Sequence, residues 1–184
     1  MAGQIIGGGR FVQFVTFTNG TTPSLGTTVV ASFADQISTD IAIDNAGVWT
    51  MTIDNIQDDE ALNTFVENYK DYSIAGVESI TYENGSKQDA NSNKTLYAIV
   101  KGGTVAGGTS AGKNKYACFA CIMDLSSAAF KQEGAKYNRP KLMFKSVEIG
   151  GGISIPSALV SGVAVTAATQ SQTTSQKYGR VFFG

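Results

Sequence analysis

A glycine-rich stretch at residues 105–116, VAGGTSAGKNKY, comes nearest to a phosphate-binding site in this chain. It contains GGTSAGKN, and a P-loop would need Ser or Thr in place of Asn114, because that hydroxyl binds the magnesium ion. A P-loop also precedes a helix, whereas the residues after Lys113 are aromatic and typical of a strand. The sequence therefore predicts a hairpin tip between strands at 95–100 and 115–123, with its lysines in solvent or reaching a partner subunit.

Two cysteines, Cys118 and Cys121, form a C-x-x-C motif, which occurs in redox pairs and as half of many zinc sites. The chain has no histidine and no further cysteine, so the other soft ligands of a zinc site are missing. The flanking residues are typical of a strand, and positions three apart on a strand point to opposite faces. The motif therefore predicts two small side chains buried in a core.

The lack of histidine also limits catalysis, because neither a Ser-His-Asp nor a Cys-His site can be built without it. The acidic run at 58–60 is explained by the first turn of a helix, where the helix dipole favours anions. Asp35, Asp40 and Asp44 lack the ligand spacing of an EF-hand, and we interpret them as polar turn residues. We therefore expect no enzyme, no metal site and no cofactor.

The overall composition fits either a protein surface that meets other proteins or a β protein that is simply rich in Thr and Ser. Charged residues make up 16% of the 184 residues, the net charge is −1 and the pI is about 5.4. A chain without a basic field is not expected to bind nucleic acid as its main function, and interface cores are depleted in charge. The N-terminal residues lack a signal-peptide pattern and no apolar run approaches the ~18 residues of a membrane span, so we expect a cytoplasmic origin.

Most of the chain reads as strands separated by turn residues, which predicts a mainly β fold with one helix. Strands are predicted at 10–18, 28–33, 48–53, 77–82, 95–100, 115–123, 141–149 and 159–167, and a short helix is a further expectation at 125–132. The one strongly amphipathic helix is predicted at 58–70, where apolar residues recur at helical spacing. These residues are Leu62, Phe65, Val66 and Tyr69.

We predict a single β-rich domain over 1–184 with an N-terminal arm at 1–9, a hairpin loop at 101–115 and a C-terminal strand at 177–184. The strand at 48–53 alternates, with Trp49, Met51 and Ile53 on one face and Thr50 and Thr52 on the other. The chain ends in the apolar sequence YGRVFFG, whose phenylalanines need cover from this subunit or from a neighbour.

In length, in its helix at 58–70 and in the segments KLMFKSVEIGGGISIPSALVSGVAV and YGRVFFG, the chain resembles the tail tube proteins of bacteriophages. It is similar in the same outline to the tube proteins of contractile injection systems and to haemolysin-coregulated protein. The resemblance implies a β-sandwich or barrel-like fold, which stacks as six-membered rings into a hollow tube. DNA passes through such a tube without specific binding.

The resemblance also implies partners, a location and contact residues. The partners are further copies of the chain and other tail proteins, without a membrane, and the location is the virion tail after assembly in the host cytoplasm. Inter-subunit contacts are expected in the loop at 19–27, the hairpin tip at 103–113, the arm at 1–9 and the segment 169–184. The individual candidates are Thr21, Pro23, Leu25, Gly107, Lys113, Tyr178, Arg180, Phe182 and Phe183. Thr50 and Thr52 are the expected lumen-facing residues.

Two other classes stay open. One is a β-sandwich capsid, decoration or carbohydrate-binding module, in which aromatic side chains would stack on sugars. The other is a small enzyme. Oligomeric state separates the first class from a tube subunit, because a tube protein associates without a ligand.

Overall fold

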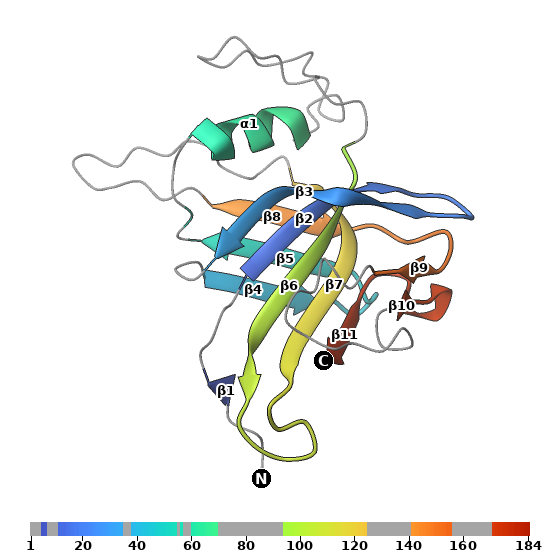
Figure 1. Ribbon diagram of the computed structural model, residues 1–184. Helices are drawn as coiled ribbons and strands as arrows, with labels where there is room; N and C mark the ends of the chain where they lie inside the picture. Colours follow the sequence, from blue (N-terminus) through green and yellow to red (C-terminus); the bar gives the residue numbers. More distant parts are fainter. Residues whose placement is uncertain are drawn as a thin grey trace, which may run out of the picture. The chain divides into compact units, whose positions relative to one another are not determined.

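A computed structural model describes residues 5–6, 11–34, 38–54, 56, 60–69, 94–124, 141–155 and 171–184, and this part of the chain is mainly β (Figure 1). The elements are β1 (Ile5–Ile6), β2 (Phe11–Thr18), β3 (Ser24–Ala34), β4 (Ser38–Ile43), β5 (Trp49–Asp54), α1 (Glu60–Tyr69), β6 (Leu96–Val105), β7 (Asn114–Met123), β8 (Leu142–Ser146), β9 (Ile153–Ser154), β10 (Ser171–Gln172), a 3₁₀ helix (Thr174–Gln176) and β11 (Arg180–Phe183). The predicted fold class, mainly β with one amphipathic helix, is confirmed at this level.

Nine of the strands form one antiparallel sheet. Its hydrogen-bonded order is β3-β2-β6-β7-β8-β5-β4, with β1 paired to β6 and β11 paired to β7, and β9 and β10 form a separate two-stranded sheet. The chain divides into two compact units, one of residues 1–35, 96–120 and 147–184 and the other of residues 36–95 and 121–146. The prediction of a single domain stays a prediction. Each unit is described by itself.

In the first unit, β2 is buried on both of its faces, as its aromatic and β-branched sequence predicted. Val12, Phe14, Val15 and Phe17 are all at most 1% exposed. The register of β2 against β6 is continuous from Phe11 to Thr16, so Phe14 and Val15 lie on opposite faces and both faces are covered. The main core cluster of this unit contains Val15, Phe17, Tyr97, Ile99, Tyr116, Cys118, Ala120, Ile149, Ile153, Ile155 and Phe182.

A buried polar network ties the polar tract near the C-terminus to this core. The Tyr97 hydroxyl donates to Gln172 Oε1 at 2.6 Å, and Gln172 Nε2 donates to the Gln176 carbonyl at 2.7 Å. Gln172 is fully buried, so these bonds replace the water that its amide would otherwise need. The sequence pattern of this tract gave no sign of a core residue.

In the second unit, the predicted alternation of β5 is confirmed. Trp49, Met51 and Ile53 are buried while Thr50 and Thr52 are half-buried. The helix α1 is confirmed over Glu60–Tyr69, and its predicted apolar residues are all buried. Phe65 packs on Phe144 of β8 with ring centroids 6.4 Å apart, so the apolar stripe of α1 covers this sheet in the way its spacing predicted.

Several features differ from the expectations. The strand β4 was not predicted, so Asp40 lies in a strand and not in a turn. Asp44 does lie in the turn that follows, and its Oδ1 accepts hydrogen bonds from the amides of Ala46 and Val48. The strand β6 continues five residues beyond its predicted end. The strands predicted at 77–82 and 159–167 and the short helix predicted at 125–132 lie outside the described residues.

Candidate assembly surfaces

The glycine-rich stretch is a hairpin turn between β6 and β7, as the sequence predicted. The Val105 amide donates to the Lys113 carbonyl and the Gly112 amide donates to the Val105 carbonyl, both at 2.8 Å. Gly108 and Gly112 have φ of 80° and 78°, which only glycine adopts at little cost. Because a strand and not a helix follows, the turn has no helix N-terminus to hold a phosphate. Lys113 and Lys115 are exposed at the hairpin.

Both cysteines are free and fully buried in β7, which confirms the core interpretation. Burial raises the pKa of the Cys118 thiol far above its usual range, an effect that the positive charge of Arg180 only partly offsets. Cys118 therefore stays protonated at neutral pH. A thiol in this state is a poor nucleophile.

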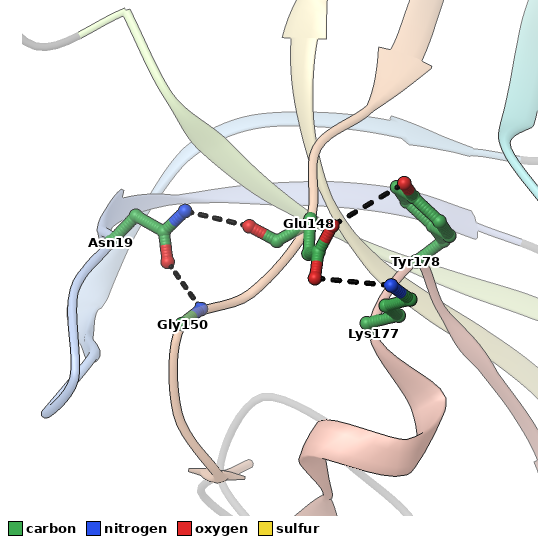
Figure 2. Close-up of polar contacts among 5 residues, drawn as sticks. All are labelled: Asn19, Glu148, Gly150, Lys177 and Tyr178. Atoms are coloured by element: carbon green, nitrogen blue, oxygen red, sulfur yellow. Dashed lines mark hydrogen bonds and ion pairs between the residues drawn. The ribbon is translucent and has the colours of Figure 1, made fainter.

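The contact loop was predicted at 19–27, but residues from Ser24 onward belong to β3. The remaining loop, residues 19–23, is bonded to its own chain (Figure 2). Asn19 Nδ2 donates to the Glu148 carbonyl at 2.8 Å, and the Gly150 amide donates to Asn19 Oδ1 at 2.9 Å. A Cβ at Gly150 would lie 2.6 Å from the Gly20 carbonyl oxygen, so only glycine permits this backbone approach. The predicted contact residues Thr21 and Pro23 pack in the same way beside Gly151, and Leu25 packs against the core cluster.

A second group of polar contacts meets at the Glu148 side chain (Figure 2). Lys177 Nζ lies 3.2 Å from Glu148 Oε1, and the Tyr178 hydroxyl donates to Glu148 Oε2 at 3.4 Å. The side chains of Lys177 and Glu148 are each about half exposed, so solvent screens the ion pair and its contribution to stability is small. Tyr178, another predicted contact residue, is therefore engaged within its own chain.

The C-terminal strand is confirmed as β11, which pairs with β7 (Figure 1). Its residues alternate between two environments. Phe182 is 6% exposed and stacks on Tyr116 with ring centroids 5.2 Å apart, so this predicted inter-subunit residue belongs to the core of its own chain. Phe183 and Val181 point to the other face and are 40% and 45% exposed. Arg180 donates from Nη1 to the Ser171 carbonyl.

One further exposed apolar side chain lies on an end strand of the sheet. Ile43 of β4 is 56% exposed, and β4 pairs only with β5 among the described strands. Ile43, Val181 and Phe183 are the exposed large hydrophobic residues of the described part of the chain. Sequence reasoning missed Ile43 and Val181. The exposure of these two side chains depends on which strands pair with β4 and β11. The local alternation of apolar and polar residues does not reveal that pairing.

The predicted lumen-facing residues lie on a polar face of the second unit. Thr50 and Thr52 pair with Ala42 and Asp40 on β4, and with Lys145 and Met143 on β8. Residues that pair directly across antiparallel strands share one face. This face therefore mixes hydroxyl groups with charges of both signs. Its orientation toward a lumen stays a prediction.

Comparisons of the chain with protein-family models, with curated proteins and with solved structures find no match. Among the described residues, no helix has the length and apolar character needed to cross a membrane. In the same part of the chain, no cluster of three or more His, Cys, Asp or Glu side chains is placed to hold a metal ion.

Proposed function

We propose that this protein is a structural subunit that self-assembles into stacked rings, forming the hollow tail tube of a phage or a related injection system. In this proposal the antiparallel sheet is part of a sandwich or barrel-like subunit fold, and the tube is a conduit for DNA. The observation that carries the proposal is the exposure of Ile43, Val181 and Phe183 on β4 and β11, which pair on one side only among the described strands. Exposed apolar strand edges favour pairing with another chain.

The charge of the molecule supports the same proposal. The chain has 14 basic and 15 acidic residues, and the Thr50 and Thr52 face carries both signs of charge. A tube wall of this kind would leave the DNA phosphates without a basic field to bind. Lysines attract DNA only when they gather into such a field, and here they are balanced by carboxylates.

The hairpin between β6 and β7 gives the proposal a second contact. The predicted contact residues Gly107 and Lys113 lie in its turn, which ends in solvent with Lys113 exposed. Two left-handed glycines fix the shape of this turn, so it can present the same surface to a neighbour in each ring. We assign the hairpin to the contact between successive rings.

The sugar-binding alternative finds less support, because Trp49 is the chain's single tryptophan and it is buried. A sugar-stacking site needs an aromatic face in solvent. Tyr97 and Tyr116 are fully buried as well. Among the described residues, Phe183 is the exposed large aromatic side chain, and the proposed assembly uses it. We therefore do not favour a carbohydrate-binding module.

Negative-stain electron microscopy over a protein concentration series tests the proposal. We expect rings or hollow tubes without added ligand, in numbers that increase with concentration. Uniform small particles at every concentration would contradict it, and a glycan-binding screen would then be the next experiment. A gel-shift assay with double-stranded DNA should show no binding at physiological salt, and tight binding would contradict the conduit role.

A further inference from the structure

The exposed hydrophobic residues of β11 sit at positions where the backbone also points outward. Gly184 and Asn114 exchange both of their backbone hydrogen bonds, with N···O distances of 3.0 Å and 2.8 Å. Hydrogen-bonded and non-hydrogen-bonded pairs alternate along antiparallel strands, so Phe182 and Arg180 bond to β7 while Val181 and Phe183 do not. The amides and carbonyls of Val181 and Phe183 therefore face away from β7, on the side of β11 where no described strand pairs.

The backbone hydrogen bonds of β4 alternate in the same way. The Asp44 amide donates to the Val48 carbonyl at 3.0 Å, which makes this pair the hydrogen-bonded one nearest the turn. By alternation Ala42 and Asp40 bond to β5, and the backbone groups of Ile43 and Ile41 point away from it. The Trp49 amide supports this alternation, because it donates away from β4 to the Ser146 hydroxyl on β8.

We propose that β11 of one copy of this chain pairs antiparallel with β4 of a second copy. The outward backbone groups meet when Val181 lies opposite Ile43 and Phe183 lies opposite Ile41. This register covers all three exposed hydrophobic residues in one contact. It also places Arg180 opposite Asp44, so a positive and a negative side chain meet across the strands. The pairing rests on the self-assembly in the proposed function and names its contact.

A second copy fits these edges better than another partner does. The register that aligns the apolar residues also aligns the opposite charges, and both halves of the contact come from this chain. Protected edges usually carry charged residues, lysine above all, or proline or a bulge. Arg180–Phe183 and Ser38–Ile43 contain no lysine or proline, and each has one charged residue, Arg180 and Asp40. Another end strand of the sheet, β3, has polar exposed residues at Thr27 and Thr28. A contact between two different edges is heterologous, and repetition makes a ring or a filament.

Two single substitutions test the pairing. Val181→Lys places a charge on β11, and Ile43→Glu places one on β4; both positions are exposed, so folding should be unchanged by circular dichroism. We expect each variant alone to associate at least about tenfold more weakly than the wild type in sedimentation velocity, because a charge would be buried against an apolar residue. Thr28→Lys on β3 is the matched control and should associate as the wild type does.

Mixing the two variants gives the decisive result. The Val181→Lys copy keeps an intact β4, and the Ile43→Glu copy keeps an intact β11. In the mixture these two intact strands can pair, so we expect at least heterodimers to form. If both variants associate like the wild type, the pairing is wrong while the proposed function stands. If the mixture does not restore association, the pairing of unlike edges is also wrong. If these results support the pairing of β11 with β4 but no ring or tube forms, the pairing stands and the proposed function is wrong.

A cross-linking experiment gives an independent readout. Hydrogen-bonded antiparallel pairs have Cα atoms about 5.5 Å apart, which a disulfide can span. A mixture of Val181→Cys and Ile43→Cys proteins should form a covalent heterodimer on mild oxidation, since the native cysteines are buried. A mixture of Val181→Cys and Thr28→Cys should not. Equal cross-linking in both mixtures would overturn the assignment.

Discussion

The polar groups around Glu148 bond within their own chain, whereas one edge of β11 exposes apolar side chains. Around Glu148, side chains and amides from three distant segments are paired within the chain (Figure 2). At the edge, the backbone groups of Val181 and Phe183 point away from β7 and meet no other described strand, and their side chains are exposed. The first region holds the subunit together, and the second is available to another subunit. Substitutions in the first should change the free energy of unfolding, and those in the second should change association.

The sharpest test compares two adjacent residues of β11. Phe182→Ala should lower the free energy of unfolding by about 3–4 kcal/mol, because it removes a buried ring stacked on Tyr116. Phe183→Ala should change it by less than about 0.5 kcal/mol, because that ring is 40% exposed. Urea unfolding followed by circular dichroism measures both. Equal losses in the free energy of unfolding would mean that the Phe182 and Phe183 faces of β11 are not buried differently.

A glycine pair gives the next largest effect. Gly150→Ala should destabilise the protein by about 1–3 kcal/mol, because its Cβ would collide with the Gly20 carbonyl oxygen. Gly107→Ala in the hairpin turn is the control, since nothing lies within 4 Å of the added methyl group and its φ is not left-handed. Thermal melts of the two variants check this. A neutral Gly150→Ala would mean that the loop at 19–23 does not pack on this segment.

Burial of Cys118 predicts a dependence of stability on pH. Its raised pKa means that the folded thiol keeps its proton, whereas the unfolded thiol loses it near the ordinary value of 9.0. Unfolding therefore releases a proton above this pH, and stability falls as pH rises, by at most about 1.4 kcal/mol per pH unit. Urea unfolding between pH 8 and 10 should show a shallower fall in the Cys118→Ala variant. An unchanged slope would contradict the burial.

The smallest effect is expected at the exposed ion pair. Lys177→Ala should cost less than about 0.5 kcal/mol, since solvent screens its bond to Glu148. Asn19→Ala should cost more, about 1 kcal/mol, because it removes two hydrogen bonds that join distant segments. Urea unfolding of both variants ranks them. If Lys177→Ala costs more than Asn19→Ala, the ion pair with the Glu148 carboxylate stabilises this region more than the Asn19 hydrogen bonds do.

Local periodicity predicted the elements whose burial follows a simple pattern. The alternation in β5 and the apolar stripe of α1 both appear in the structure, because each buries one face against its own unit. The strand β4 was missed because it is mostly exposed and, among the described strands, pairs with β5 alone, so its sequence STDIAI carries little apolar pattern. Contacts between residues far apart, such as Asn19 and Glu148, have no local signal at all.

The assembly surface was only partly predictable for a related reason. The apolar end of the chain indicated that Phe182 and Phe183 needed cover, but the sequence does not say which of the two faces the core. The register of β11 against β7 decides this, by placing Phe182 opposite Tyr116 and Phe183 opposite Lys115. The same register leaves Val181 exposed, although nothing in its neighbours distinguishes it from a buried strand residue.

Hydrogen exchange at residue resolution, measured at low and high protein concentration, tests the central claim that the open edges pair between copies. The account predicts that the amides of Val181, Phe183, Ile41 and Ile43 exchange more slowly as concentration increases. The amides of Arg180 and Phe182, already bonded to β7, should be protected at both concentrations. Fast exchange of the four outward amides in a protein that has assembled would contradict the account.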